Sequence, residues 1–478
     1  FYANNTSEIM QIRNAGNSSF INLFTLAGGP AFAVDGTINS VNIGKGANSA
    51  VGNTVLGESA LDDSVTGTGN TAIGNSSLTA LTSGQNNTAV GRLSLSSLTT
   101  ASNNVAMGNS ALGVNETGAS NVAIGVSCLD ANTSGASNVA MGHHALGANT
   151  TASNNVAIGN ASLKLNETGA SNTALGANSL DASTVGNNNT AIGANALTDN
   201  TAGDRNTCAG AFSLYTNTTG EKNTSIGYES LKDSVDGDQN TAVGNQALAN
   251  NVSGNNNVAV GSLCLFTATA GGNVGVGKSA LQLCETAADN TGVGKQAGKN
   301  ITTGGNNTAV GADSLLNCST GANNTAVGND AGDVTTIGSN CTSLGYQADP
   351  SSNSASNEVT LGNSSVSALR CQVALTVLSD RRDKTNIIDL STGLDFVNTL
   401  KPRQFEWKTR EGVPNKDGTV RAGFIAQELQ EAQKGSEFLN LVYESNPEKL
   451  EATYGNLIPV LVKAIQELSA KVTALEAG

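Results

Sequence analysis

Apolar and polar residues recur along most of the chain with a period of 17 residues. Glycine marks the period from Gly57 to Gly261, a one-residue deletion moves the next glycine to Gly277, and the period then resumes to Gly362. Asparagine lies four residues before most of these glycines, alanine two before, Val, Ile, Leu or Met one before, and leucine four after. These nineteen units are too regular for chance and are typical of a solenoid.

Each unit predicts one short strand and two turns. Its glycine and asparagine residues disfavour a helix. The three residues before the glycine alternate between two faces, as in a strand, and the glycine itself suits a turn. We expect equivalent residues to stack from coil to coil, forming a ladder of hydrogen-bonded asparagines over a core column of Val/Ile and Leu. The alanine position should lie on the opposite face of the strand from Val/Ile, and this small face would allow a second chain to approach closely. One such coil encloses a thin core, so lateral association is expected.

The period divides the chain into four predicted regions. Residues 1–40 lack the repeat, are richer in Phe and predict an adaptor or cap; residues 41–345 predict a β-solenoid shaft of 17-residue repeats. Residues 346–378 predict an irregular stalk or tip, in which Asp349-Pro350 is expected to break the sheet. Residues 379–478 predict a small α/β domain. Because the chain begins at Phe1 and not at methionine, we expect an upstream segment.

The last region predicts several short elements and a terminal helix. Leu394, Val397 and Leu400 form a helical face that Pro402 ends, and 423–433 predicts another helix. Phe405 and Trp407 alternate as in a strand, and the turn at 414–418 implies a hairpin. The final apolar residues lie three and four apart, as in a coiled coil of under three heptads: Ile458, Leu461, Ile465, Leu468, Val472 and Leu475. This seam alone favours a dimer, so a trimer requires the rest of the chain.

Composition excludes several functional classes. With 56 Gly and 4% aromatic residues, the chain resembles a fibrous or solenoid protein more than a globular enzyme. Before Ser379 there are 23 acidic and 11 basic residues, so we expect no nucleic-acid partner. No apolar run is long enough to span a membrane, and no membrane insertion is expected.

No cofactor or metal is expected either. The seven cysteines are scattered over several repeat phases, which predicts small buried apolar residues in a reducing compartment. His143 and His144 fall at variable positions that are expected at the surface, and a metal site formed by a ring of them is disfavoured. No carboxylate pair stands out as a glycosidase site, and the recurrent Asn-x-Thr triplets follow from the asparagine ladder more simply than from glycosylation.

Two parts of the sequence resemble known families. The repeat phrase NTAIGNSSL is similar to the head repeats of YadA-like trimeric autotransporter adhesins, which are trimeric left-handed β-rolls with typically shorter repeats. The last hundred residues resemble the intramolecular chaperone of endosialidase family, the self-cleaving C-terminal domains of phage tail spikes and fibres. The matching segments are SDRRDK at 379–384, LKPRQFEWK at 400–408, GFIAQEL at 423–429 and YGNLIPVLVKAIQEL at 454–468.

The second resemblance implies a serine-lysine dyad, here Ser379 and Lys384, that releases the domain by autoproteolysis after it has trimerised and folded the upstream fibre. A serine hydroxyl needs a base, and a lysine serves as one only when neutral. The nearby Arg381 and Arg382 favour the neutral form, whereas Asp380 and Asp383 oppose it. We favour cleavage of the Leu378-Ser379 bond, although the bond after Ser379 stays open. The alternative is that SDRRDK is only a charged turn at the start of a domain.

Together these features predict a homotrimeric phage fibre, held in the virion by an attachment protein at its N-terminal side and assembled in the host cytoplasm. Its partner would be a host cell-surface glycan or protein. No turnover enzyme is expected beyond self-cleavage. Two alternatives are a bacterial trimeric surface adhesin and a polysaccharide-degrading tail spike.

Overall fold

The computed structural model describes residues 8–10, 23–25, 36–38, 41–46, 50–372, 377, 379–406, 419–444, 447–448 and 450–478. Most of the expected N-terminal adaptor, Trp407 and the turn at 414–418 lie outside these residues. The chain divides into two compact units, Phe1–Lys278 and Ser279–Gly478, directly after the shortened coil that ends at Gly277.

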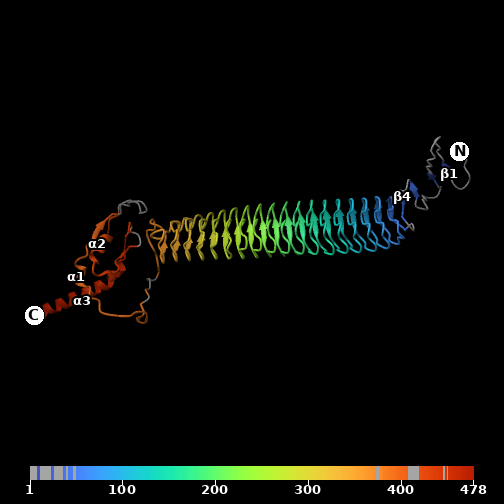
Figure 1. Ribbon diagram of the computed structural model, residues 1–478. Helices are drawn as coiled ribbons and strands as arrows, with labels where there is room; N and C mark the ends of the chain where they lie inside the picture. Colours follow the sequence, from blue (N-terminus) through green and yellow to red (C-terminus); the bar gives the residue numbers. More distant parts are fainter. Residues whose placement is uncertain are drawn as a thin grey trace. The chain divides into compact units, whose positions relative to one another are not determined.

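The first unit begins with antiparallel pairs and continues as a parallel stack. β1 (Glu8–Met10) pairs with β2 (Leu23–Thr25), and β3 (Gly36–Ile38) pairs with β4 (Val41–Gly44), which pairs with β5. From β5 to β18 each strand pairs in parallel with the next, one coil later (Figure 1). These strands are β5 (Thr54–Gly57), β6 (Thr71–Ile73), β7 (Thr88–Val90), β8 (Val105–Met107), β9 (Val122–Ile124), β10 (Val139–Met141), β11 (Val156–Ile158), β12 (Thr173–Leu175), β13 (Thr190–Ile192), β14 (Thr207–Ala209), β15 (Thr224–Ile226), β16 (Thr241–Val243), β17 (Val258–Val260) and β18 (Val274–Val276).

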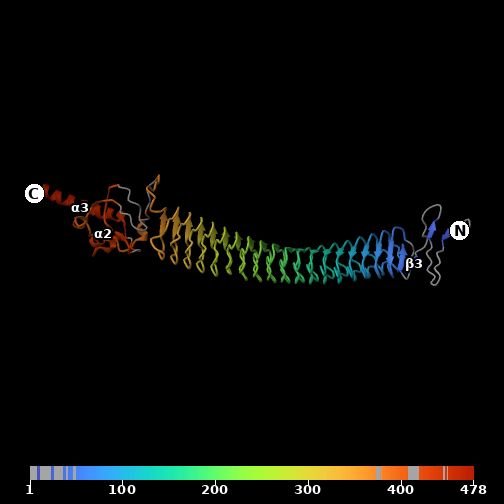
Figure 2. The same ribbon diagram turned by 90° about the horizontal axis from the view of Figure 1, so that it is seen from above.

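The second unit continues the same repeat before the C-terminal domain. Its parallel strands lie side by side in both views (Figures 1 and 2) and are β19 (Thr291–Val293), β20 (Thr308–Val310), β21 (Thr325–Val327), β22 (Thr342–Leu344) and β23 (Val359–Leu361). The chain is thus mostly β, with 18 solenoid turns at 17-residue spacing, which confirms the predicted fold class.

From β6 onward, the glycine after each solenoid strand adopts a backbone conformation with positive φ, and in most coils it also lies too close to the next coil for a side chain. Gly227 has φ +133°, and a Cβ added there would lie 2.4 Å from the carbonyl oxygen of Gly244 in the next coil. The turn that follows also uses left-handed residues two and four positions after the glycine in the coils from Gly57 to Gly328, such as Phe212 at φ 55° and Leu214 at φ 53°. Left-handed backbone lets the chain reverse direction within a few residues.

The core contains the alanine column and the leucine column. Alanines at the strand centre, such as Ala140 and Ala191, and leucines four after the glycine, such as Leu146 and Leu197, are fully buried. The predicted leucine column is therefore confirmed. The expected Val/Ile core column and outward alanine face are wrong: Val/Ile points outward, as Ile192 illustrates at 42% exposed. The coil is thin, so most coils place alanine, serine, cysteine or glycine at the inward position beneath the strand, although β5 buries Val55 there.

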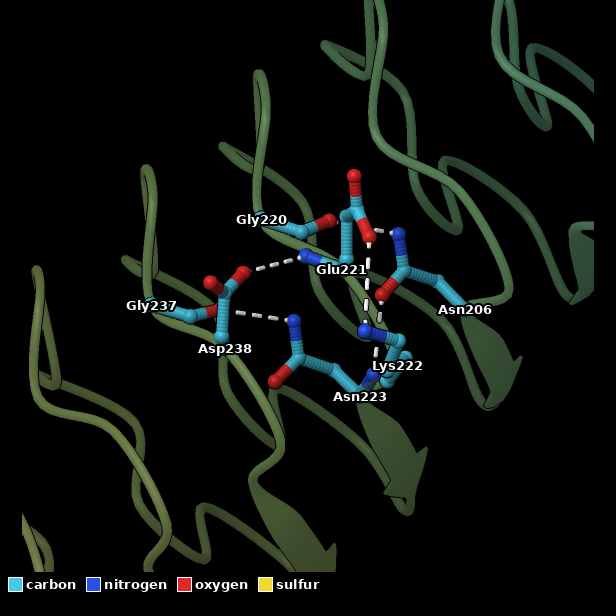
Figure 3. Close-up of polar contacts among 7 residues, drawn as sticks. All are labelled: Asn206, Gly220, Glu221, Lys222, Asn223, Gly237 and Asp238. Atoms are coloured by element: carbon cyan, nitrogen blue, oxygen red, sulfur yellow. Dashed lines mark hydrogen bonds and ion pairs between the residues drawn. The ribbon is translucent and has the colours of Figure 1, made fainter.

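The asparagine ladder is present, but its main partners are backbone groups. The backbone amide of Asn223 donates to the side-chain oxygen of Asn206 at 3.0 Å, and the Asn223 side-chain nitrogen donates to the carbonyl of Gly237 at 2.7 Å (Figure 3). Direct side-chain pairs of the expected kind occur as well, as between Asn87 and Asn70 at 3.1 Å. Each buried asparagine thus connects its coil to both neighbours.

A second inward column lies seven residues after the glycine and was not predicted. It holds leucine in early coils (Leu81), asparagine in later ones (Asn132) and cysteine further on (Cys284), all buried. Where it holds asparagine it forms another ladder, since Asn132 donates to Asn115 at 2.8 Å. Its residue type changes along the chain, so the column is hidden in the consensus.

The expectation that Asp349-Pro350 breaks the sheet is wrong. β23 follows this dipeptide and pairs in parallel with β22, with Val359 opposite Thr342. Pro350 lies in the turn after β22 and removes no amide from the strand ladder.

The C-terminal domain is a small α/β structure, as predicted. It contains η2 (Arg381–Asp383), α1 (Leu394–Val397), β24 (Arg403–Phe405), β25 (Arg421–Gly423), α2 (Ala426–Ala432), η3 (Glu437–Leu439), β26 (Val442–Tyr443), β27 (Glu451–Ala452), η4 (Tyr454–Asn456) and α3 (Leu457–Glu476). β24 pairs antiparallel with β25, and β26 with β27.

Among the core residues of this domain, Phe396 of α1 and Leu429 of α2 pack with Leu457 and Val460 of α3. The Glu467 carboxylate of α3 accepts a hydrogen bond from the Leu394 amide at 2.8 Å, which fixes the start of α1. Among the described helices, none is long and apolar enough to cross a membrane.

Candidate functional site

The segment from Ser379 to Lys384 forms a compact capped turn. Asp380 caps η2, because its carboxylate accepts the backbone amide of Arg382 at 2.8 Å. The Lys384 amide donates to the carbonyl of Arg381 at 3.2 Å and closes the turn. The turn thereby brings the two ends of the segment, which are five residues apart in sequence, close together.

This turn brings the two predicted dyad residues into contact. The Lys384 ammonium donates a hydrogen bond to the Ser379 hydroxyl oxygen. Both side chains are exposed in the single chain. A serine and a lysine in this contact can act as nucleophile and base once the amine is neutral, because the neutral amine can accept the hydroxyl proton. Leu378, on the other side of the favoured cleavage bond, lies outside the described residues.

The charges around the dyad are partly offset within the turn. The Arg382 guanidinium binds the Asp380 carboxylate through two nitrogens, with Nη2 at 2.6 Å from Oδ2 and Nε at 3.1 Å from Oδ1. These hydrogen bonds lower the pKa of Asp380 and raise that of Arg382, so both stay ionised near neutral pH. Of the two arginines expected to act on Lys384, Arg382 is thus occupied by a carboxylate in the same turn.

A second functional feature is an apolar stripe on the outer face of the solenoid strands. We use the name apolar stripe for the residues one before each repeat glycine, which are all Val, Ile, Leu, Met or Ala, together with the Thr or Val three before. Exposed members include Met107 at 42%, Ile226 at 42% and Leu344 at 39%. Exposed apolar surface that recurs on every coil is unusual for a protein that stays monomeric.

The terminal helix α3 presents a similar surface. Leu457, Val460 and Ala464 are buried in its own domain. All six residues of the predicted coiled-coil seam are exposed instead, from 42% to 80%: Ile458, Leu461, Ile465, Leu468, Val472 and Leu475. The helix therefore has two apolar faces, and its own domain covers one of them.

The remaining candidate residues are structural or at the surface. Six of the seven cysteines are buried as expected, and burial raises the pKa of Cys128 and Cys208 to about 12; Cys371 is exposed, contrary to expectation.

His143 is exposed and His144 half-buried, with ring centroids 4.0 Å apart. In the described part of the chain, no cluster of three or more His, Cys, Asp or Glu could hold a metal ion. Glu428, the acidic residue of the GFIAQEL segment at 423–429, forms a two-point ion pair with Arg403, with its oxygens 2.6 and 2.9 Å from the guanidinium nitrogens.

Comparison with known families adds one match. Residues 379–440 match the family model described as chaperone of endosialidase, which begins at the candidate serine. No curated protein and no solved structure matches the chain. The chain therefore carries a chaperone-of-endosialidase domain at 379–440, preceded in sequence by a β-solenoid body, a combination that fits a phage tail fibre or spike.

Proposed function

We propose that this protein is a homotrimeric phage fibre whose C-terminal domain aligns three chains, drives folding of the shaft and is then released by self-cleavage. The observation that carries the proposal is the uniform repeat body followed directly by a chaperone-of-endosialidase domain. A uniform repeat has many nearly equivalent registers, and a slip of one coil costs little locally. A separate trimerisation domain sets the common register before the shaft forms.

The apolar stripe and the exposed seam of α3 support assembly. Both are rows of apolar side chains, one along the strands and one along a helix, and neither is covered within the single chain. A homotrimer would bury both rows against equivalent rows of the other chains. Burial of such surface is the main source of free energy in obligate interfaces.

The self-cleavage step follows from the contact between Ser379 and Lys384. Neutral Lys384 takes the hydroxyl proton while Ser379 Oγ attacks the carbonyl carbon of Leu378. The C–N bond breaks, the proton passes to the leaving amine of Ser379, and Leu378 becomes an ester on Oγ. Water then hydrolyses the ester, which frees the Leu378 carboxylate and restores the serine hydroxyl. Loss of the chaperone makes the assembled shaft kinetically hard to unfold.

The test is intact-mass measurement combined with sedimentation of the freshly expressed full chain. We expect a trimeric shaft and a released fragment beginning at Ser379. Ser379→Ala and Lys384→Ala should each give an unprocessed trimer, whereas Ser391→Ala, an exposed serine in the same domain, should be processed normally. Equal processing in all variants would exclude the dyad, and a monomeric protein would exclude the fibre.

We further propose that the shaft meets the host surface, binding a glycan or protein there, while an attachment protein holds the N-terminal side in the virion. Labelling of intact virions with an antibody to the shaft should place the protein on a tail or capsid fibre. Absence of label from virions that contain the polypeptide on a blot would count against this location.

A further inference from the structure

Aromatic residues are rare in the shaft and three of them lie together. Between Gly57 and Gly345 the sequence has four Phe, Tyr or Trp residues: Phe212, Tyr215, Tyr228 and Phe266. The centroid of the Phe212 ring lies 5.7 Å from that of Tyr215 in the same coil and 6.3 Å from that of Tyr228 in the next coil. Both pairs are packed edge to face. None of the three belongs to the buried core, and Tyr228 is 48% exposed.

Polar groups border these rings on the following coils. The Tyr228 hydroxyl is hydrogen-bonded to the Glu229 carboxylate, and the Gln246 side-chain nitrogen donates to the same carboxylate at 2.8 Å. The hydrogen bond from Gln246 and that from Tyr228 lower the pKa of Glu229, so the carboxylate stays ionised. We use the name aromatic patch for Phe212, Tyr215, Tyr228, Glu229 and Gln246.

The aromatic patch lies on repeat positions that stay in contact with water when the apolar stripe assembles. Its residues occupy the positions one, two and five after the repeat glycine. Other coils place charged residues there, including Arg92, Asp313 and Lys164, whereas the apolar stripe has no charged residue in any coil. Burying the charged positions in a trimer interface would leave charges without water, at a large cost in free energy.

No folding role accounts for the rings at these positions. The position of Phe212 has left-handed backbone in every coil from Gly57 to Gly345, and most coils fill it with small or polar residues such as Ser, Asn or Gln. Phe212 gains no core packing there, because it is not among the buried residues of the leucine and alanine columns. Aromatic residues grouped outside the core beside an amide and a carboxylate are typical of a binding surface.

We propose that the aromatic patch binds a neutral carbohydrate of the host surface. This inference rests on the proposed function as an attachment fibre and assigns its receptor site. Phe212 and Tyr228 offer ring faces and edges on which the C–H face of a sugar ring can pack, and the Tyr215 hydroxyl adds a polar group beside them. Gln246 and Glu229 supply planar donors and acceptors for vicinal sugar hydroxyls.

Charge and size select this class of ligand over others. The chain before Ser379 has 23 acidic against 11 basic residues, so an anionic polysaccharide would be repelled. The patch has five side chains on three successive coils, whereas a stable protein interface uses about 20–30 residues per partner. A sugar needs only a few stacked rings and hydrogen bonds.

The test is binding of the full-length trimer to an array of neutral bacterial O-polysaccharides and neutral hexasaccharides, with hyaluronan and heparin fragments as anionic comparators. We expect at least one neutral glycan to bind, and Phe212→Ala and Tyr228→Ala each to weaken that binding about tenfold. Phe266→Ala is the matched control, because Phe266 occupies the same repeat position as Tyr215 three coils further on, and it should bind like the wild type.

Three results would overturn the proposal: no neutral glycan bound, only anionic glycans bound, or equal loss in the Phe266→Ala control. Adhesion to host cells that survives periodate oxidation but is lost after protease treatment would assign a protein receptor and also overturn it. Trimer mass and release of the terminal domain are measured on the same samples. If both are normal while glycan binding is absent, the receptor assignment fails and the fibre assignment stands.

Discussion

The backbone amide of Asn223 donates to the side-chain oxygen of Asn206, and Asn223 in turn accepts the backbone amide of Asn240 at 2.9 Å. Each asparagine therefore satisfies a buried amide of the next coil while its own nitrogen satisfies a turn carbonyl. Removing one such side chain leaves two buried backbone groups without partners.

Asn223→Ala should lower the free energy of unfolding by about 3 kcal/mol, because unsatisfied buried polar groups cost about 1–3 kcal/mol each. Hydrogen exchange should rise in the coils on either side of residue 223 and little elsewhere, since repeats interact mainly with their neighbours. Asn245→Ala, at an exposed position, is the control and should leave exchange unchanged. Equal effects of the two substitutions would contradict a role for the ladder.

The sequence carried enough information for the fold class but not for the sidedness of each strand. The period located every strand, and the positions of asparagine and leucine identified two of the inward columns. Alternation before the glycine showed that Ala191 and Ile192 point to opposite sides, yet it could not show which side is inside. Hydrophobicity favoured the isoleucine, whereas the thin coil buries a small residue at the inward position in nearly every repeat.

For the candidate site, the sequence proposed the two residues but not the geometry that surrounds them. The SDRRDK motif indicated Ser379 and Lys384, and the turn brings their side chains together. The capping of that turn by Asp380 and the pairing of Arg382 away from the lysine depend on backbone conformation, which the motif alone does not specify. The aromatic patch was missed because its rings are spread over residues 212–228 and only meet when coils stack.

A charge placed in the apolar stripe should prevent assembly of the shaft. Ile192→Lys with Ile226→Lys puts six like charges into the interface of a trimer, and a buried charge without a partner costs about 3–5 kcal/mol. Sedimentation should show loss of trimer or of folded shaft. Ala194→Lys, exposed and two residues from Ile192, should assemble normally. Full assembly of the doubly substituted chain would show that the stripe is not the interface.

The exposed seam of α3 should control trimer formation without affecting the fold of its own domain. Leu468→Glu introduces three carboxylates into the proposed helical interface, whereas the faces that bury Leu457 and Val460 stay unchanged. We expect at least a tenfold loss of trimer stability, corresponding to about 1.4 kcal/mol, with little change in unfolding of the released domain. Gln466→Glu adds the same charge at an exposed position beside the seam and should be tolerated.

Asp349 makes the stability of the coil near the end of the repeats depend on pH. It occupies the position where most coils bury leucine, and its Oδ1 atom is buried without a hydrogen-bond partner among the described residues. Burial, and then the nearby Asp333 carboxylate, raise the pKa of Asp349 to about 6 from its ordinary value of 3.8. Burial and the neighbouring Asp330 and Asp313 raise the pKa of Asp333 in the same direction.

Because the pKa of Asp349 is raised in the folded protein, the folded protein binds more protons than the unfolded chain between the unfolded value of 3.8 and about 6. The stability that this protonated carboxyl contributes is therefore fully present below pH 3.8 and is lost as pH rises through about 6. Asp349 is partly exposed, so solvent screening reduces the effect to about 1–2 kcal/mol. Protection factors in the coil from Gly345 to Gly362, which correct the exchange rates for their intrinsic dependence on pH, should be lower at pH 8 than at pH 4.5.

Asp349→Asn removes the charge that becomes unfavourable above pH 6 and should slow exchange in this coil at pH 8 while leaving it nearly unchanged at pH 4.5. Asp63→Asn is the matched control, because Asp63 is exposed to solvent, and it should leave exchange unchanged at both pH values. A variant at Asp349 that exchanges faster than the wild type at pH 8 would mean that the ionised carboxylate stabilises the coil, so the pH dependence would have the opposite sign.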